Sequence, residues 1–350
     1  MPMKIKIKTV KERATHMKRI IALLLVAISL FTLAGCGGKS EAGAPAEEKN
    51  VTLKLGFQAN AGSNEYMAAE LLAEKAKEYS NGTITVEIFP GGQLGDDRAM
   101  IDQVAAGALD MTYSETGRLG LWEAELEIFG YPFAFDDYDH LIRTLTETEY
   151  GKAINAKLEA RGWKILADAY NGTRHTTTNK AINSIEDMKG LKLRVPNAAA
   201  NLAFAEYSGA AATPMPFAEV YLALKTNAVD GQENPLSTID AQKFYEVQPY
   251  CALTGHIIND NNYIISKIVY DKLSPAQQEA ITKATVEAAE FHTNKFIEDE
   301  TALLEKFEEM GMTITTPDKT AFREACAPMY EEYVAKFGDA AVKAIEEARQ

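Results

Sequence analysis

An uninterrupted helical pattern near the C-terminus places the strongest constraint on the fold. It runs from Ser274-Pro275 to Met310 and contains no glycine, and no proline after Pro275. A helix of roughly 37 residues is far longer than the usual one, and at about 1.5 Å per residue it would extend along two domains. We therefore expect a long helix, straight or kinked, that connects or backs two domains.

The rest of the chain alternates short β-patterned runs with helical ones, which is typical of a mainly parallel sheet covered by helices. The predicted strands are 51–57, 83–89, 109–113, 165–170, 191–195, 251–258, 262–266 and a short one before residue 318. The predicted helices are 63–79, one that starts at 96–97, 198–208, 217–226, 237–245, 318–336 and 339–349.

The N-terminus carries the pattern of an export signal. Met17-Lys18-Arg19 is basic, the run 20–33 is almost purely apolar, and the run ends in Leu33-Ala34-Gly35-Cys36. An apolar run of this length is typical of a signal peptide and is too short to span a bilayer. We predict a signal peptide over 1–35 with Met17 as the true start, a lipidated Cys36, and a flexible tether over 36–50, which has no large apolar side chain.

The charge of the chain argues against polyanionic partners. The whole chain has 36 Lys and Arg against 50 Asp and Glu, a formal charge of −14. Residues 1–35 hold seven of the basic residues and one of the acidic ones, so the mature chain would carry a charge of −20. Such a field repels nucleic acid and anionic membrane surfaces. An anionic ligand would therefore need a cation placed locally to hold it.

The cysteines and histidines predict neither a metal site nor a cofactor. The five histidines have no metal-ligand spacing, and no Cys/His cluster suggests zinc. Cys251 and Cys326 remain after the predicted cleavage. They could form a disulfide in an oxidising compartment, but two isolated, buried small hydrophobic residues are the favoured interpretation.

Two predicted α/β domains, an export signal and one helix long enough to touch both domains favour an α/β fold with a two-lobed, periplasmic-binding-protein-like clamshell. A two-lobed enzyme would show a similar pattern. Polar stretches lie where the pattern predicts sheet edges and loops, at 93–98, 113–118, 170–174, 191–197 and 230–235. In open α/β sheets, ligands bind beyond the carboxyl ends of the strands, where such stretches converge.

Arg194 is the most informative single residue of these stretches. It alternates with Leu193 and Val195 on a predicted strand that ends at Pro196-Asn197. An arginine on a strand is usually a solvated residue. At the tip of a strand, however, a guanidinium can hold a carboxylate with two parallel hydrogen bonds, which an ammonium cannot do.

Four long motifs carry a resemblance to a known family. They are YNGTRHTTTNKAINSIEDMKGLKLRVPNAAANLAFAEYSGA (170–210), FAEVYLALKTNAVDGQENP (217–235), GGQLGDDRAM (91–100) and the pair KFYEVQPY and GHIIND within 243–260. These motifs resemble the solute-binding proteins of tripartite ATP-independent periplasmic (TRAP) transporters, in the branch that binds sialic acid. The resemblance extends along essentially the whole mature chain.

The resemblance implies an anion clamp. Arg194 would form a two-pronged salt bridge with the ligand carboxylate, and Arg174 and Asn234 would complete the clamp. Glu233 and His256 would orient Arg174 from behind. The remaining implied ligand-binding residues would meet the sugar ring, its tail and its acetamido group; they are Gln58, Asp97, Ser114, Glu115, Arg118, Asn197 and Phe217.

The chain also departs from the pattern of this branch. Ser114 stands where a small apolar residue is usual, Asn261 replaces a common glutamine, and Gly255 replaces a larger polar residue. The stretch 211–216 differs from the usual sequence before Phe217, and a lipoprotein box is unusual in the group. These changes leave the clamp residues in place and bear on the preference among sialic acid variants.

The implied function is binding and not catalysis. Sialic acid would bind between lobe I (51–171 with 260–299) and lobe II (172–259 with 300–350), and the closed form would deliver it to the membrane permease subunits. We expect a monomer that is held at the membrane by its lipid anchor, outside the cytoplasm, and has no nucleic-acid partner. Three alternatives stay open: a receptor for another sugar acid, keto acid or dicarboxylate; an enzyme that uses Glu115 and Asp97 as an acid/base pair; and an envelope sensor or adhesin.

Overall fold

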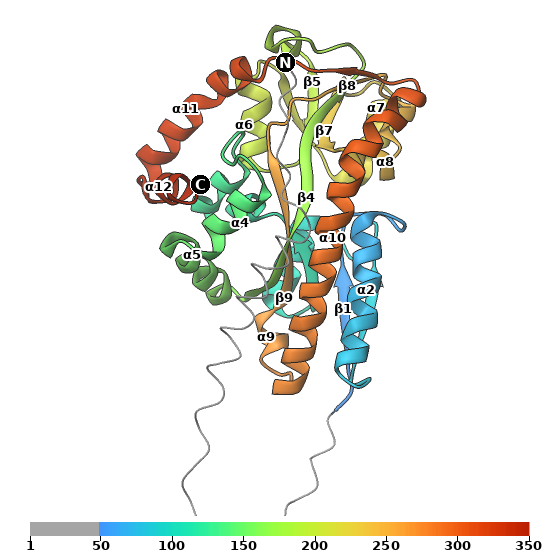
Figure 1. The fold of residues 1–350 in the computed structure, drawn as a ribbon, viewed down its shortest axis with the longest axis vertical. Coiled ribbons are helices and arrows are strands. Elements are labelled where there is room, and N and C mark those ends of the chain that lie inside the picture. Colours follow the sequence, from blue (N-terminus) through green and yellow to red (C-terminus); the bar gives the residue numbers. More distant parts are fainter. Residues whose placement is uncertain (1–48, 350) are drawn as a thin grey trace, which may run out of the picture. The chain divides into compact units, whose positions relative to one another are not determined.

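Two long antiparallel strands, β4 (Trp163–Thr178) and β9 (Ile258–Ser266), form the middle of the protein (Figure 1). The computed structural model describes residues 49–349, so the predicted signal peptide, Cys36 and most of the tether lie outside the described residues. The sheet order is β2-β1-β3-β9-β4-β7-β5-β6, with β8 paired to β4 and β10 paired to β8. The pairs β1–β2, β1–β3, β5–β6 and β5–β7 are parallel.

Strand β4 divides this sheet into two groups of strands. From Trp163 to Thr173 it pairs with β9, and from Arg174 to Thr178 it pairs with β7 and β8. The register with β9 shifts between Tyr170 and Thr173, where Gly172 has a φ of 89°. A Cβ at Gly172 would lie 2.6 Å from the Cβ of Pro235, so this close crossing requires a glycine.

The other strands are short and the helices cover them. The strands are β1 (Val51–Gly56), β2 (Ile84–Phe89), β3 (Met111–Ser114), β5 (Lys192–Val195), β6 (Ala211–Pro214), β7 (Gly231–Pro235), β8 (Tyr250–Ala252) and β10 (Thr313–Thr315). The α-helices are α2 (Asn64–Tyr79), α3 (Asp97–Ala106), α4 (Tyr138–Thr146), α5 (Glu149–Ala160), α6 (Ala199–Tyr207), α7 (Val220–Lys225), α8 (Leu236–Ala241), α9 (Lys267–Tyr270), α10 (Pro275–Glu309), α11 (Lys319–Phe337) and α12 (Ala340–Glu347). Short 3-10 helices are η1 (Thr116–Leu121), η2 (Ala124–Gly130), η3 (Ile185–Met188), η4 (Phe217–Glu219) and η5 (Phe244–Glu246).

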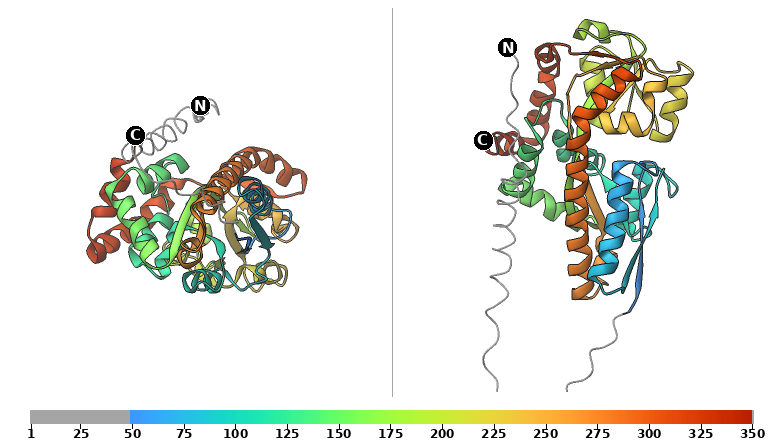
Figure 2. Two further views of the ribbon diagram at one scale, coloured as in Figure 1. Left: turned by 90° about the horizontal axis from the view of Figure 1, so that it is seen from below. Right: turned by 45° about the vertical axis from the view of Figure 1, so that its right-hand side comes forward.

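Helix α10 confirms the predicted long helix, with 35 residues. Ser274 and Gln277 form a reciprocal capping box that satisfies backbone donors at its start. Its first half packs beside α2 in the apolar core around β1, while Leu303 and Phe307 near its other end pack with α7 and α8 in a separate core. The helix changes direction between these two parts (Figure 2). One helix therefore belongs to the cores of both halves, as expected of a connection between lobes.

Most predicted elements occur at the expected positions; strand β6 was not predicted, β4 continues beyond the predicted strand to Thr178, and three further differences follow. Residues 231–235, interpreted as part of a polar loop, form the buried strand β7 between β4 and β5. The strand predicted over 251–258 ends at Ala252, because Gly255 adopts a φ of 54° and turns the chain. Helices α4 and α5 were not predicted, although Asp137 and Thr148 cap their first turns with side-chain hydrogen bonds.

The two cysteines are free and buried in different cores, Cys251 beside α7 and Cys326 on α11. The favoured interpretation, two isolated hydrophobic residues, is therefore confirmed over a disulfide. Among residues 49–349, no cluster of three or more His, Cys, Asp or Glu could hold a metal ion. Within the same range, no helix has the length and apolar character needed to cross a bilayer.

Candidate ligand-binding cleft

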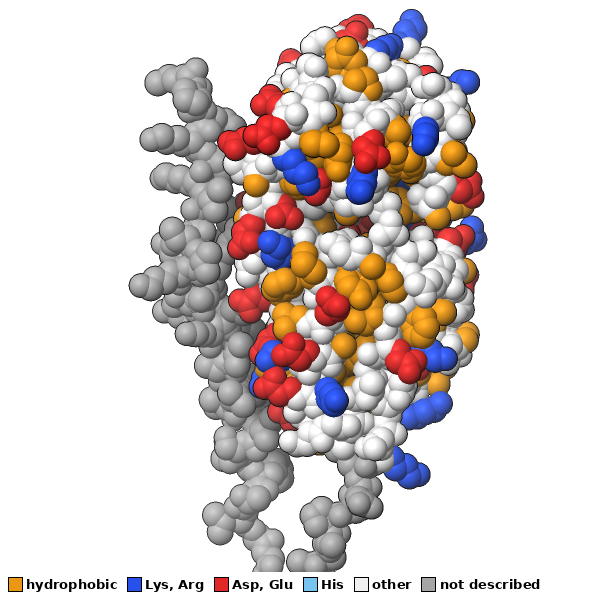
Figure 3. All heavy atoms as spheres, turned by 90° about the vertical axis from the view of Figure 1, so that its right-hand side faces the viewer, with side chains coloured by type: hydrophobic (Ala, Val, Ile, Leu, Met, Phe, Trp, Pro, Cys, Tyr) orange, Lys and Arg blue, Asp and Glu red, His pale blue; other side chains and the backbone are white. Residues whose placement is uncertain are grey.

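One cavity of about 360 Å³ lies where the two groups of strands meet. The space-filling view shows a hollow between the upper and lower halves of the face beside α2 and α8 (Figure 3). All ten residues predicted to bind the ligand line this cavity, and they come from both groups of strands. They are Gln58, Asp97, Ser114, Glu115, Arg118, Arg174, Arg194, Asn197, Phe217 and Asn234.

The local folding of the chain explains this convergence. Strands β1, β3 and β5 each end at the cavity, so Gln58, Ser114 and Asn197 lie at or just beyond their carboxyl ends. Arg174 lies on β4 at the point where its pairing changes from β9 to β7. The cavity is therefore formed by strand ends and by the crossing of β4 from one group to the other.

Arg194 is a buried cation without a counterion among the described residues. Its side chain is 2% exposed, and its Nη2 donates to the carbonyl oxygen of Met215 at 2.8 Å. Its Nε is buried with no hydrogen-bond acceptor, and the guanidinium lies 5.9 Å from the centre of the Phe217 ring. Burial lowers the pKa of Arg194 to about 9, so the group still carries its charge at neutral pH. The cavity therefore contains a buried positive charge that no carboxylate within residues 49–349 neutralises.

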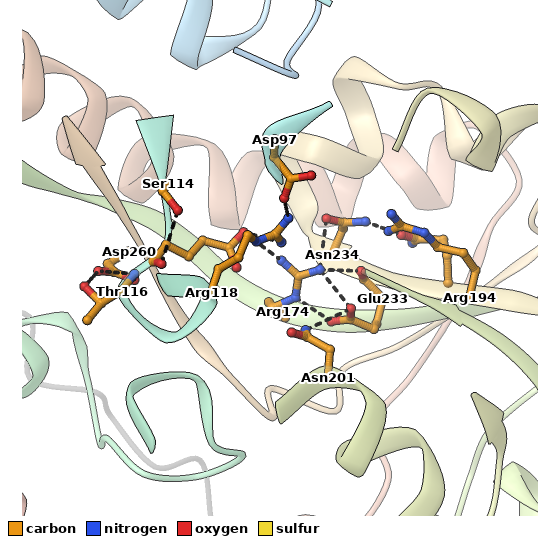
Figure 4. Close-up of polar contacts among 12 residues, drawn as sticks. Asp97, Ser114, Thr116, Arg118, Arg174, Arg194, Asn201, Glu233, Asn234 and Asp260 are labelled. Atoms are coloured by element: carbon orange, nitrogen blue, oxygen red, sulfur yellow. Dashed lines mark hydrogen bonds and ion pairs between the residues drawn. The ribbon is translucent and has the colours of Figure 1, made fainter. Parts of the chain in front are cut away.

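Arg174, by contrast, has a counterion, Glu233 (Figure 4). Its Nε donates to Glu233, and its Nη2 donates to Glu233 Oε1 at 2.9 Å, to the Glu233 carbonyl at 2.8 Å and to Asn234 Oδ1 at 3.2 Å. Asn234 in turn donates from Nδ2 to Gln232 at 2.5 Å. The side chain of Arg174, on β4, is therefore held by residues of β7, and its Nη1 lies 3.8 Å from Glu115 Oε1.

Glu233 and His256 form the support behind Arg174. Glu233 is 0% exposed and also accepts from Asn201 at 3.2 Å. Although burial raises the pKa of Glu233, Arg174 and His256 lower it to about 2 overall. Burial lowers the pKa of His256, so its neutral ring donates from Nε2 to Glu233 at 3.1 Å and accepts at Nδ1 from the Thr254 hydroxyl at 2.9 Å. The structure thus places both residues behind Arg174, away from the cavity lining.

A second cluster of charges lies on the side of α3 and η1. Arg118 donates to Asp97, and its Nη2 donates to Glu115 at 3.1 Å. Burial opposes the charge of Arg118, but the two carboxylates raise its pKa overall. Burial likewise raises the pKa of Asp97, but the pairing with Arg118 lowers it below the usual value. A carboxylate held ionised in this way, as in Asp97, can accept hydrogen bonds from hydroxyl groups.

The same pairing argues against the acid/base alternative. A general acid in a glycosidase needs a carboxyl group with a raised pKa, whereas the pKa of Asp97 is lowered and Glu115 is bonded to the same arginine. The cluster is suited to hold a polar ligand, and Asp97 does not have the raised pKa that a general acid requires.

The remaining predicted residues lie as follows. Gln58 donates from Nε2 to the Gly95 carbonyl at 2.9 Å, and the ring of Phe217 lies beside Arg194 and Phe244. Asn197 is exposed at the rim of the cavity. Ser114 donates weakly to the Glu115 carbonyl at 3.4 Å, which leaves its hydroxyl available to a ligand. The individual ligand contacts predicted for these residues stay predictions.

Sequence reasoning missed several lining residues, above all Glu65 and Tyr113. Glu65 was interpreted only as part of the start of a helix, and Tyr113 as the end of a strand and the first residue of the polar stretch 113–118, without a role of its own. Both positions lie within or beside stretches already noted, but their burial at the cavity depends on the packing of α2 against β1 and β3. No sequence pattern signals that packing.

Comparison with known proteins shows the family to which this chain belongs. A family model described as bacterial extracellular solute-binding protein, family 7 (DctP), matches residues 55–336. The chain belongs to this family. The predicted membership of the TRAP solute-binding proteins and the two-lobed α/β fold are thereby confirmed.

Family 7 relatives differ in the ligands named for them. The sialic acid-binding periplasmic protein SiaP of Vibrio cholerae is 46% identical over 314 residues, which cover 89% of this chain and 95% of that protein. The 2,3-diketo-L-gulonate-binding periplasmic protein YiaO of Escherichia coli is 33% identical over 78% of this chain and 84% of its own length.

Solved structures of family 7 proteins share this fold and hold sugar acids. The sugar acid binding protein of Advenella mimigardefordensis in complex with galactonate has a TM-score of 0.81 and 32% identity, covering 86% of this chain and 98% of that one. A TRAP solute-binding protein of Roseobacter denitrificans with bound β-D-glucuronate has a TM-score of 0.80 and 30% identity, covering 84% and 99%. This family 7 chain is therefore an extracytoplasmic solute-binding protein that works with membrane permease subunits, and it is not an enzyme.

Proposed function

We propose that this family 7 protein binds a sialic acid, N-acetylneuraminate, and delivers it to a TRAP permease. The observation that carries the proposal is the buried, charged guanidinium of Arg194 beside Phe217, which has no counterion within residues 49–349. A carboxylate there would gain charge-assisted hydrogen bonds, and an acetamido methyl would have an aromatic surface nearby. The identity to the Vibrio cholerae SiaP over nearly the whole of both chains supports the same ligand.

The cluster of Asp97, Glu115 and Arg118 supports a ligand with one carboxylate and several hydroxyls. Ligand hydroxyls can donate to the two acids, whereas a second carboxylate at this end would meet two negative charges held by one arginine. This argument disfavours dicarboxylates. Simple uronates and aldonates lack the acetamido methyl and so lose its apolar contact, which contributes on the order of 1 kcal/mol.

A panel of acids tests this proposal by competitive titration calorimetry on the mature protein. We expect N-acetylneuraminate to bind most tightly and its N-glycolyl or deaminated variants about ten-fold or more weakly. We expect no detectable binding of glucuronate, galactonate or succinate. Ser114 could reverse the order of the acetyl and glycolyl forms by bonding the extra hydroxyl. Tight binding of galactonate or succinate, with no binding of N-acetylneuraminate, would show that the proposed ligand is wrong and that the protein is a receptor for a different acid.

Closure of the two lobes over the ligand is part of this proposal. The proposed lobes, 51–171 with 260–299 and 172–259 with 300–350, divide the chain near the register shift in β4 and at the start of β9. A ligand that touches Glu115 on one side and Arg194 on the other collects all its contacts only in the closed state, so it favours closure.

We also propose that Cys36 is lipidated and anchors the protein at the outer face of a membrane. The support comes from the sequence alone, because this segment lies outside the described residues. It consists of the apolar run before Cys36 and the small residues at 34–35. Intact-mass analysis of membrane-fraction protein should show a chain that begins at a diacylated Cys36. We expect Cys36→Ala to be unprocessed or cleaved elsewhere, and an unmodified Cys36 in the wild-type membrane fraction would refute the anchor.

A further inference from the structure

Glu65 is a buried carboxylate that lines the cavity and has no role in the clamp. Glu65 lies in the first turn of α2 and is 9% exposed. The polar groups nearest to its carboxylate are the Ser63 side chain and the backbone at the start of the helix. No Lys, Arg or His within residues 49–349 forms an ion pair with it. Burial raises the pKa of Glu65 despite hydrogen bonds from the Ser63 side chain and its own backbone. The helix start alone therefore does not offset the desolvation of this carboxylate.

Tyr113 lies in the same wall of the cavity. Its ring stacks on Phe57 at 4.9 Å and meets the edge of Tyr263 at 4.6 Å between ring centres, which fixes its position. Its hydroxyl is buried beside the hydroxyl of Tyr263, and no described residue accepts its proton. A buried donor left without an acceptor costs about 1–3 kcal/mol. Burial raises the pKa of Tyr113; the hydroxyl of Tyr263 lowers it in part and the charge of Glu65 adds a smaller increase, so the Tyr113 hydroxyl keeps its proton and can donate.

The charges around the cavity show what these two groups could recognise. Asp97 and Glu115 share Arg118, and Arg174 is paired with Glu233. Two buried charged residues of the cavity lining have no ion-pair partner within residues 49–349. Arg194 is a cation without a carboxylate, and Glu65 is a carboxylate without a cation. The two come from different groups of strands, since β5 carries Arg194 and α2 packs on β1 and β2. A ligand with a carboxylate and a distant hydroxyl complements both.

We propose that Glu65 and Tyr113 form a separate recognition point that reads one hydroxyl group of the bound sugar acid. Glu65 accepts the hydrogen of that hydroxyl, and the Tyr113 hydroxyl donates to its oxygen. This inference rests on the proposed ligand class, a hydroxylated acid held by Arg194. The pair makes the cavity selective for acids that carry a hydroxyl at this position, while Arg194 holds the carboxylate that all of them share.

The test compares two isosteric variants with a control on the same helix. Glu65→Gln removes the charge, Tyr113→Phe removes the hydroxyl, and Glu70→Gln changes an exposed acid of α2. Each variant is titrated with N-acetylneuraminate and with its monodeoxy analogues, one for each hydroxyl. We expect the first two variants to bind N-acetylneuraminate about ten-fold more weakly and the control to bind it like the wild type. With one of the deoxy analogues, the difference between variant and wild type should vanish.

Thermal unfolding separates recognition from a structural role. Glu65→Gln should leave the melting temperature of the ligand-free protein unchanged or raise it, because it removes a buried carboxyl group whose desolvation is not offset. Two results would overturn the inference: both variants binding within two-fold of the wild type, or an equal loss of affinity for N-acetylneuraminate and every deoxy analogue. If the wild type binds a different sugar acid, the proposed function fails, and the same variants are tested with that acid and its deoxy forms.

Discussion

Arg194→Ala is expected to weaken binding of the acid ligand by about two to four decades, roughly 3–5 kcal/mol. The guanidinium is buried and charged, and no described carboxylate neutralises it, so a ligand carboxylate would be its counterion. Removing it would leave that carboxylate desolvated and without its main partner. The measurement is titration calorimetry of the variant and the wild type with the same ligand.

Two further variants make this prediction specific. Arg194→Lys should restore only part of the affinity, because an ammonium cannot form the two parallel hydrogen bonds. Lys192→Ala, a change of an exposed cation on the same strand, should leave binding unaffected. The ligand-free Arg194→Ala protein should melt at the same temperature as the wild type or higher, because the variant lacks an uncompensated buried cation. Equal affinity of the Lys variant and the wild type would exclude a two-pronged salt bridge.

Glu233→Gln should have the largest effect on stability, with a loss of about 3–5 kcal/mol in the free energy of unfolding. Glu233 is 0% exposed and is the counterion of Arg174, so the variant leaves a buried guanidinium without its charge partner. The control Glu78→Gln removes an exposed pair with Lys75 and should change the stability by less than about 1 kcal/mol. Denaturant unfolding of the three proteins at neutral pH measures both effects.

The pH dependence of stability gives this prediction a second readout. The pKa of Glu233 is about 2 in the folded protein, below the value of about 4.3 for an unfolded chain. A group with a lowered pKa contributes stability above its unfolded pKa and loses it as the pH falls through the folded pKa. The wild type should therefore lose this contribution between about pH 4.5 and 2, and Glu233→Gln should lack that part of the slope. A variant as stable as the wild type at pH 7 would contradict the account of this pair.

Sequence reasoning predicted the long helix from contiguous residues, whereas the resemblance to a family supplied the proposed clamp. The pattern from Ser274 to Met310 is unbroken, and Arg194 lies between two features that the chain itself shows, an alternating strand and Pro196. The motif around 231–235 was recognised for its residues but was placed in a loop. Its polar side chains are buried in β7 because Arg174, Thr177 and Asn201 satisfy them across the sheet, which a local pattern cannot reveal.

The residues missed by sequence reasoning share one physical cause. Glu65 belongs to a helix start and Tyr113 to a strand end, and each would be unremarkable in isolation. They become a candidate recognition point only when α2, β1 and β3 pack together and remove both groups from water. Helices α4 and α5 were missed for a different reason, since their caps at Asp137 and Thr148 precede short segments, of nine and 12 residues.

The central claim is that Arg194 binds the carboxylate of a sialic acid in the cleft of this receptor. A double-mutant cycle tests it directly, with wild type and Arg194→Ala each titrated with N-acetylneuraminate and with its methyl ester, which lacks the carboxylate charge. We predict that the wild type binds the acid at least two decades more tightly than the ester, and that Arg194→Ala binds both with similar weak affinity. An acid and an ester that differ as much in the variant as in the wild type would contradict the claim, because the carboxylate would then be held by another group.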